Sequence, residues 1–211
     1  MKKIYFVRHG ESEGNTGPVR QGQNSSLTPK GLMQSEIIAE RCEKLSIDSI
    51  ISSTMKRAVE TAKIILARLK KSAEYSDLFI ERRRPKEQIG VLKNDPKALD
   101  AEKTIRENFT VSGFRFSDEE NFDDLKTRAS QALRYLQQKS ERNMLVITHG
   151  FFLRIIVAYA VFGEKLTAQE CEQFIQKFHT ENTGVTVLGF DEKNNTSPWW
   201  LWVWNDHAHL G

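Results

Sequence analysis

Cysteine is scarce in this chain of 211 residues, and neither sign of charge dominates. The two cysteines, Cys42 and Cys171, lie far apart without metal-ligand spacing, which argues against a disulfide framework or a zinc site. The 31 basic residues nearly balance the 28 acidic ones, so nucleic acid is not an expected partner. We therefore expect reduced core thiols in a protein that does not bind nucleic acid.

Long apolar runs and low-complexity segments are also absent. The longest apolar stretch, Phe151 to Phe162, is interrupted by Arg154 and is too short to cross a bilayer. The amino terminus has only four apolar residues before Arg8, which is too few for a signal peptide. We expect a cytoplasmic protein without a membrane partner. Length and composition fit a single α/β domain over residues 1–211.

The first candidate for chemistry is a short strand followed by Arg-His-Gly. Residues 4 to 7 are β-branched or aromatic, as in a buried strand. Gly10 permits a sharp turn directly after Arg8 and His9. Because α/β sheets place their ligands at the carboxyl ends of strands, this pattern predicts a phosphate site there.

A second segment repeats this pattern far along the chain. The apolar residues 144 to 147 lead to Thr148, His149 and Gly150, and a helical pattern follows over residues 151–162. One such triplet is only suggestive, but two strand-ending His-Gly pairs indicate a shared site.

A third segment joins a short strand at residues 48–51 to a helix through a Ser/Thr cluster. Ser53 or Thr54 is the expected N-cap of that helix. Arg57 then falls in the first turn, beside free backbone N–H groups and the positive end of the helix dipole. Such a position suits an anion.

Together these segments resemble the histidine phosphatase superfamily, the broad group that includes the cofactor-dependent phosphoglycerate mutases. The resemblance covers nearly the whole chain. Its further motifs are Glu11-Ser12-x-x-Asn15, Arg20-Gln21-Gly22, Leu27-Thr28-Pro29-Lys30-Gly31 with Gln34, and Ser52-Ser53…Arg57-Ala58…Thr61-Ala62. The resemblance implies a three-layer α/β/α fold.

The order of strand and helix patterns points to the same fold class. Strands alternating with helices predict right-handed crossovers and a mostly parallel central sheet with helices on both faces, an α/β/α sandwich. The stretch from about 80 to 120 reads as irregular, and we expect it to be a small inserted cap over the strand ends. The Trp-rich segment 199–204 is predicted to be a strand packed on both faces.

Two arginines and two histidines at strand ends suit the non-bridging oxygens of a phosphate monoester. We expect Arg8, Arg57, Asn15 and the Gly150 amide to bind the phosphoryl group. His9 is the predicted nucleophile, with one ring nitrogen donating to a backbone carbonyl so that the other keeps its lone pair. A phosphohistidine intermediate would follow.

The leaving alcohol needs a proton, which calls for a carboxylic acid with a raised pKa. Glu81 resembles the family's proton donor by position, although three arginines, Arg82 to Arg84, follow it where relatives often carry glycine and a second acid. Glu11, Glu87 and Glu120 therefore stay open as alternatives. The arginines form either a solvated run, an anion-binding cluster or a guide for a charged substrate tail.

These features predict a metal-independent phosphomonoester hydrolase that acts on a small phosphorylated metabolite and needs no cofactor. His149 is expected to join the catalytic group by stabilising the transferring phosphoryl. Gln21 and Gly22 are expected at the substrate rim, where residues 16–26 and the cap would select the alcohol. The alternatives are a phosphoglycerate mutase and a non-catalytic phosphate-binding regulatory module.

Overall fold

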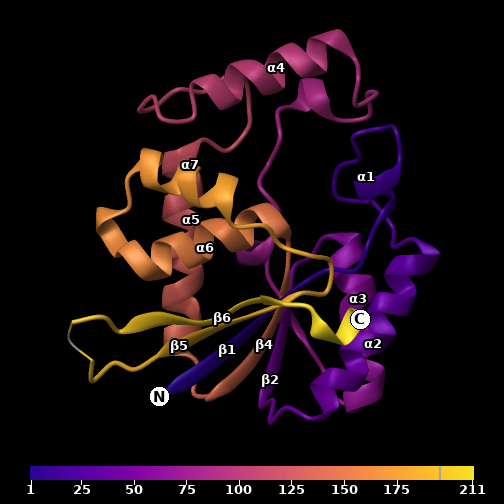
Figure 1. Ribbon diagram of the computed structural model, residues 1–211, viewed down its shortest axis with the longest axis vertical. Coiled ribbons are helices and arrows are strands. Elements are labelled where there is room, and N and C mark those ends of the chain that lie inside the picture. The colour runs from indigo at the N-terminus through magenta and orange to yellow at the C-terminus, as the bar shows by residue number, and fades with distance from the viewer. Residues whose placement is uncertain (195) are drawn as a thin grey trace.

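A sheet of six strands forms the centre of the computed structural model, which describes residues 1–194 and 196–211 (Figure 1). The strands are β1 (Lys2–Arg8), β2 (Ser49–Ser52), β3 (Glu74–Tyr75), β4 (Asn143–Thr148), β5 (Val185–Phe190) and β6 (Trp199–Asp206). Their order across the sheet is β3-β2-β4-β1-β5-β6. The first four are parallel to one another, whereas β5 and β6 pair antiparallel to their neighbours.

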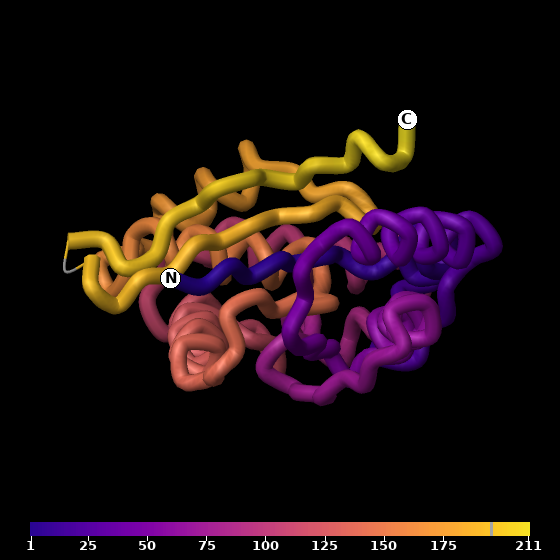
Figure 2. The backbone as a smooth tube through the Cα atoms, turned by 90° about the horizontal axis from the view of Figure 1, so that it is seen from below, coloured from indigo at the N-terminus to yellow at the C-terminus, as the bar shows by residue number. Residues whose placement is uncertain are grey.

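Helices connect most of these strands. They are α1 (Glu13–Thr16), α2 (Pro29–Glu43), α3 (Lys56–Leu69), α4 (Pro96–Glu107), α5 (Phe122–Gln138), α6 (Gly150–Phe162) and α7 (Ala168–Lys177). Short 3₁₀ turns are η1 (Asp77–Phe79), η2 (Lys86–Gln88), η3 (Gly163–Lys165) and η4 (Ala208–Leu210). Within the described ranges, no helix combines the length and apolarity that crossing a bilayer requires. The two chain ends lie well apart (Figure 2).

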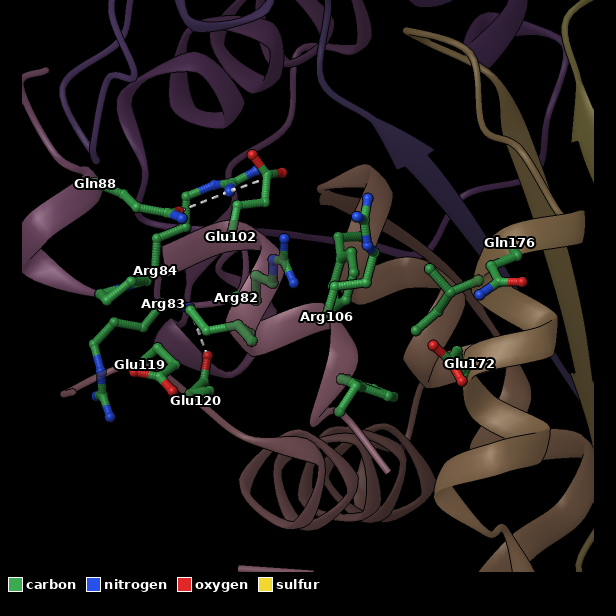
Figure 3. A pocket seen from close by; sticks show the side chains of 15 residues that line it. Arg82, Arg83, Arg84, Gln88, Glu102, Arg106, Glu119, Glu120, Glu172 and Gln176 are labelled. Atoms are coloured by element: carbon green, nitrogen blue, oxygen red, sulfur yellow. Dashed lines mark hydrogen bonds and ion pairs between the residues drawn. The ribbon is translucent and has the colours of Figure 1, made fainter. Parts of the chain in front are cut away.

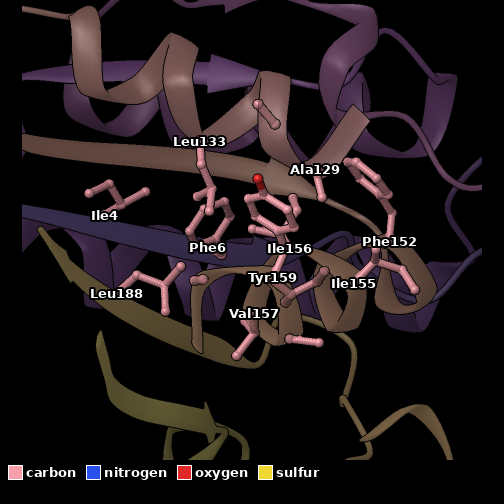
Figure 4. Close-up of a cluster of buried hydrophobic side chains, with 14 of the residues drawn as sticks. Ile4, Phe6, Ala129, Leu133, Phe152, Ile155, Ile156, Val157, Tyr159 and Leu188 are labelled. Carbon is pink, nitrogen blue, oxygen red and sulfur yellow. The ribbon is translucent and has the colours of Figure 1, made fainter. Parts of the chain in front are cut away.

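Alternating side chains of the central strands fill two separate hydrophobic cores. In β1, Ile4 and Phe6 pack toward α5 and α6, whereas Val7 packs toward α2 and α3. In β4, Met144 belongs to the first of these cores and Leu145 to the second. Figure 4 shows the first core. Because successive residues of a strand point to opposite faces, helices cover both sides of the sheet, and the predicted three-layer arrangement is confirmed.

The segment from residue 80 to 120 is more regular than predicted, because it contains α4. Asp95 caps this helix by accepting the Ala98 amide at 3.0 Å, and Pro96 occupies its first turn. An Asp-Pro pair is a standard helix start, so the signal was present in the sequence. The helix lies apart from the sheet, beyond the strand ends (Figure 1).

The Trp-rich strand was expected to be packed on both faces, and this prediction is wrong. β6 is an edge strand that pairs with β5 alone among the described strands. Trp199 is buried, but Trp202 is 46% exposed. Trp204 packs edge-on against Phe174 and Phe178 of the α7 region, so helices cover only one face here.

The start of α3 also differs from the prediction. Its N-cap is Met55, and neither Ser53 nor Thr54 caps it. The Ser53 hydroxyl accepts the Met55 amide at 3.2 Å but also lies 2.7 Å from a ring nitrogen of His149. A tertiary contact to His149 therefore engages this hydroxyl, which does not cap α3.

Candidate active site

The two predicted histidines meet because their strands are neighbours. β1 and β4 are parallel with Arg8 opposite Thr148, so the residues that follow the strands emerge side by side. The His9 amide donates to the Thr148 carbonyl at 3.0 Å, and the rings of His9 and His149 lie 5.0 Å apart. Both side chains are buried.

His9 has the hydrogen-bond arrangement of a neutral imidazole. Its Nδ1 lies 2.7 Å from the carbonyl oxygen of Gly10, which can only accept, so Nδ1 carries the hydrogen. Nε2 then keeps its lone pair and accepts a hydrogen bond from Arg57 Nε at 3.0 Å. Burial, followed by the charges of His149, Arg57 and Arg8, lowers the pKa of His9 well below its ordinary value. The expected bond from one ring nitrogen to a backbone carbonyl is present.

His149 lies behind His9 as the N-cap residue of α6. Its Nε2 lies 2.7 Å from Ser53 Oγ, while its buried Nδ1 has no partner among the described residues. Burial and then the Arg57 charge lower its pKa well below the ordinary value. A neutral His149 whose Nε2 accepts from the Ser53 hydroxyl carries its hydrogen on Nδ1. The sequence pattern did not indicate this contact and offered Ser53, along with Thr54, as a candidate helix cap.

A cleft of about 450 Å³ opens in front of His9. It is lined by Arg8, His9, Ser12, Gly14, Asn15, Gln21, Arg57, Glu81, Arg82, Arg84, Gly150, Phe151, Arg154, His179 and Thr180. Arg57 stands in the first turn of α3, as predicted. Gly22 lines the adjoining cavity instead, and its carbonyl accepts from Arg57 Nη1 at 3.2 Å.

Asn15 in α1 and Gly150 at the start of α6 both line the cleft. The Asn15 Oδ1 accepts from the Ser12 amide at 3.0 Å, which turns this oxygen toward the protein and leaves Nδ2 for the cleft. Gly150 is the first residue of α6, where backbone N–H groups are free. A Cβ there would lie 3.1 Å from Arg8 Nε, so glycine allows this close approach.

Glu81 lies at the amino-terminal end of α6. Its carboxylate accepts backbone N–H groups from Arg82 at 2.9 Å, Phe151 at 3.1 Å and Phe152 at 2.9 Å. Burial raises its pKa, but the Arg82 N–H bond and the Arg57 charge outweigh burial, and the net pKa is lowered. The expected raised pKa is therefore wrong for the free protein, because backbone N–H groups and nearby arginine charges stabilise the anion.

The other candidate acids lie elsewhere. Glu11 contacts Thr28 Oγ1 at 2.9 Å, and Glu87 contacts Ser117 Oγ at 2.9 Å. Glu120 holds Arg128 through two bonds of 2.7 and 2.8 Å. None of the three lines the cleft of His9, whereas Glu81 does.

A loop before β5 completes the site, and no motif in the sequence had indicated it. Asn182 Nδ2 donates to the His9 carbonyl at 2.8 Å, and the Thr183 amide donates to the Arg8 carbonyl at 2.9 Å. Arg8 Nη1 in turn donates to the Thr180 carbonyl at 2.5 Å. Thr183 has a φ of 59°, which is unusual for a β-branched residue. Such conformations persist where surrounding contacts hold them.

Metal-ligating side chains do not gather here. Across residues 1–194 and 196–211, no three or more His, Cys, Asp or Glu side chains are grouped in a way that could hold a metal ion. The cleft instead presents arginine donors, which suit an anion.

The family model for the histidine phosphatase superfamily (branch 1) matches residues 4–205, and the chain belongs to this superfamily of phosphoryl-transfer enzymes. It is 35% identical over 220 residues to a protein of Escherichia coli O1:K1 named "Probable phosphoglycerate mutase GpmB", covering 100% of this chain and 95% of that protein. It is 28% identical over 201 residues to a Hydrogenobacter thermophilus protein provisionally named phosphoserine phosphatase 2, covering 93% of each.

Solved structures share the fold. A phosphoserine phosphatase mutant from Entamoeba histolytica, in complex with phosphoserine, superposes with a TM-score of 0.77 at 22% identity and covers 100% of both chains. At this identity the similarity establishes the fold alone.

Proposed function

We propose that the protein is a metal-independent phosphomonoester hydrolase in which His9 accepts the phosphoryl group of a small phosphorylated metabolite and water then releases it. The observation that carries this proposal is the hydrogen bond of His9 Nδ1 to the Gly10 carbonyl, which leaves Nε2 unprotonated inside an arginine-lined cleft.

Substrate binding must first free this nucleophile. Arg57 Nε occupies the lone pair of His9 Nε2 in the free protein. A phosphoryl dianion is a stronger acceptor for a guanidinium than a neutral imidazole is, so Arg57 turns to a phosphoryl oxygen and exposes Nε2. Arg8, Asn15 Nδ2 and the Gly150 amide supply further donors to the equatorial oxygens.

Attack by Nε2 then forms the N–P bond and breaks the P–O bond of the alcohol. His149, whose ring lies 5.0 Å from that of His9, is proposed to stabilise the developing charge as a buried neighbour of the nucleophile. The leaving oxygen takes a proton from Glu81. In the second step Glu81 removes a proton from water, which attacks the phosphohistidine and returns His9 to its neutral state.

The lowered pKa of Glu81 in the free protein is compatible with this role, because the charge of the bound substrate changes that pKa. A phosphoryl dianion beside the carboxylate raises its pKa by repulsion between like charges. Glu81 is thus an anion before binding and takes up a proton together with the substrate. The acid required for the leaving alcohol forms only in the complex.

Two segments at the mouth of the cleft are proposed to select the alcohol. Gln21 lines the cleft, and residues 82 and 84 of the 80–120 segment line it from another side. The 80–120 segment would then act as the cap, while the strand ends bind only the phosphoryl group.

The test is phosphate release in EDTA from sugar phosphates, phosphoglycerates, nucleotides and phosphopeptides. His9→Ala should abolish both turnover and the acid-labile phosphoenzyme, whereas His207→Ala, at an exposed histidine of the tail, should retain both. Unchanged turnover in His9→Ala would exclude the proposed nucleophile, and strong inhibition by EDTA would exclude the metal-independent mechanism.

Phosphoglycerate mutase activity is the second candidate, and the name of the Escherichia coli relative favours it. The same panel separates the two. Conversion of 3-phosphoglycerate to 2-phosphoglycerate without phosphate release would establish the mutase. Phosphate-ester binding without any turnover would establish the regulatory module.

A further inference from the structure

Three arginines that the proposed mechanism does not use line one side of the cleft. We call Arg82, Arg84 and Arg154 the arginine wall. They share the cleft with Arg8 and Arg57, and Glu81 is the sole carboxylate in its lining as the described residues define it. A phosphoryl dianion matches the charges of Arg8 and Arg57, which leaves the three positive charges of the wall facing one carboxylate.

Arg154 is held by carbonyl groups. Its Nε donates to the Gly150 carbonyl at 3.1 Å, and its Nη1 donates to the Ile175 carbonyl at 2.6 Å. No carboxylate within the described part of the chain lies within ion-pair distance of it. These contacts fix the guanidinium in place but do not neutralise its charge.

Arg82 is held by an aromatic ring. Its guanidinium lies 3.9 Å from the ring centre of Phe151, and that of Arg154 lies 5.4 Å from the same centre. Burial, with the nearby charge of Arg84, lowers the pKa of Arg82 to about 10. Like charges gathered in a partly buried wall are costly unless an anion compensates them.

The acidic partner of Arg84, Glu102, is distant and is shared with another arginine. The Nη1 of Arg84 donates to Gln88 Oε1 at 3.1 Å and lies 4.0 Å from Glu102 (Figure 3). Glu102 is bound more closely by Arg20. One carboxylate divided between two arginines does not neutralise both.

The wall also borders a second cavity of about 170 Å³, which lies between the 80–120 segment and α7 (Figure 3). Arg82, Arg84 and Phe151 line both spaces. Arg106 lines this second cavity but not the cleft of His9, and it is exposed. Several glutamates line the same cavity. Arg106 therefore provides a matched control for charge loss near the wall.

We propose that the arginine wall binds a second anionic group of the substrate, so that the preferred substrates are small phosphomonoesters whose alcohol also carries a carboxylate or a second phosphate. This inference rests on the proposed function, because it places the phosphoryl group at His9. The wall then acts as a specificity-determining element. It selects the alcohol by charge and leaves phosphoryl transfer to the strand ends.

Matched substrate pairs test the inference. 3-Phosphoglycerate and glycerol 3-phosphate differ by a carboxylate, and fructose 1,6-bisphosphate and fructose 6-phosphate differ by a phosphate. We expect kcat/KM to favour one or both of the more anionic partners by about tenfold or more, as a charge-assisted contact predicts. The pair that shows the preference identifies the second anion as carboxylate or phosphate.

Substitutions in the arginine wall test whether it causes the preference for the more anionic substrate. Arg84→Gln and Arg154→Gln should each reduce the ratio of kcat/KM within the preferred pair to less than about threefold. Arg106→Gln should leave the ratio unchanged. Arg84 is partly exposed, so its variant keeps the test valid even if loss of the Arg154 contacts unfolds the protein. An unaltered ratio in a folded Arg84→Gln would overturn the assignment.

The outcomes separate this inference from the proposed function. A His9-dependent enzyme that treats both members of each pair alike overturns the second-anion inference and leaves the hydrolase intact. Absence of turnover on every substrate overturns the hydrolase instead. Calorimetric titration with both substrate pairs then decides the inference, because equal affinities within both pairs contradict it.

Discussion

The two ends of the cleft are built in different ways. The end proposed to bind the phosphoryl group, called the phosphoryl end below, consists of residues at strand ends, such as His9 and His149, which backbone pairing between β1 and β4 places side by side. The end proposed to hold the leaving group, called the leaving-group end below, consists of Glu81 and the arginine wall, which come from the segment after β3 and from α6. Sheet geometry holds the first end, and side-chain contacts hold the second.

This difference separates the proposed phosphoryl transfer from the proposed selection of the substrate alcohol. Moving His9 relative to His149 would require a shift in register between two buried strands, which would move every core side chain on them. Changing Arg84 would disturb only contacts to Gln88 and Glu102 in a segment outside the sheet. The phosphoryl end is therefore hard to alter without unfolding the protein, whereas the leaving-group end can change with the substrate.

The largest effect is expected at the phosphoryl end. Arg57→Ala should lower kcat/KM by about 10²–10³-fold, because it removes a buried donor aimed at the transferring group. Arg57→Lys should recover only part of the loss, since an ammonium lacks the planar fork. Steady-state kinetics and the yield of phosphoenzyme measure both variants. A loss below about threefold in Arg57→Ala would mean that this end does not bind the phosphoryl group.

The second largest effect is expected from Glu81, which lies where the two ends of the cleft meet. Glu81→Gln should lower hydrolysis of alkyl phosphates by about 10²-fold but affect para-nitrophenyl phosphate much less, because nitrophenolate leaves without a proton. Comparing the two substrates under the same conditions gives the answer. Equal losses would assign the acid to another group.

A smaller effect is expected from the loop that supports the phosphoryl end. Asn182→Ala removes the donor to the His9 carbonyl and should lower kcat by about tenfold, with a smaller change in KM, through misplacement of the nucleophile. Rapid-mixing measurement of phosphoenzyme formation checks this. A rise in KM at constant kcat would show that Asn182 binds substrate instead of positioning His9.

The smallest effect concerns stability and pH. His9 and His149 are neutral when folded, with pKa values lowered well below 6.5 by burial, so the unfolded chain binds more protons below this pH. Their contribution to the free energy of unfolding is complete above pH 6.5 and is lost as pH falls toward the folded pKa values. Each contributes a slope of up to about 1.4 kcal/mol per pH unit in that window.

Urea unfolding at several pH values measures this slope. His149→Gln should reduce it by the share of one histidine, whereas Arg84→Gln at the leaving-group end should not change it. An identical slope in His149→Gln and the natural protein would contradict a neutral, buried His149.

Sequence patterns predicted well where the strand ends and the helix start place Arg8, His9 and Arg57, because these determinants are local. A β-branched run that ends in Arg8 and His9 places a strand end, and a helix start places Arg57 near it. The sequence patterns failed where residues distant in the chain decide how a strand packs or which charge state a side chain takes. The Trp-rich strand is an edge because no further strand lies beyond it in the described sheet. The pKa of Glu81 is lowered, not raised, because the Arg82 amide, the Arg57 charge and the Phe151 amide stabilise its anion.

The sequence by itself determined the three-layer class, the paired histidines and the family, since strand alternation and short motifs need only nearby residues. Tertiary structure alone decided that Asn182 holds His9, that Ser53 contacts His149 and that Arg154 stands in the wall. These contacts join residues far apart in the chain, and their energies depend on burial and distance, which exist only after the strands have paired and the helices have packed.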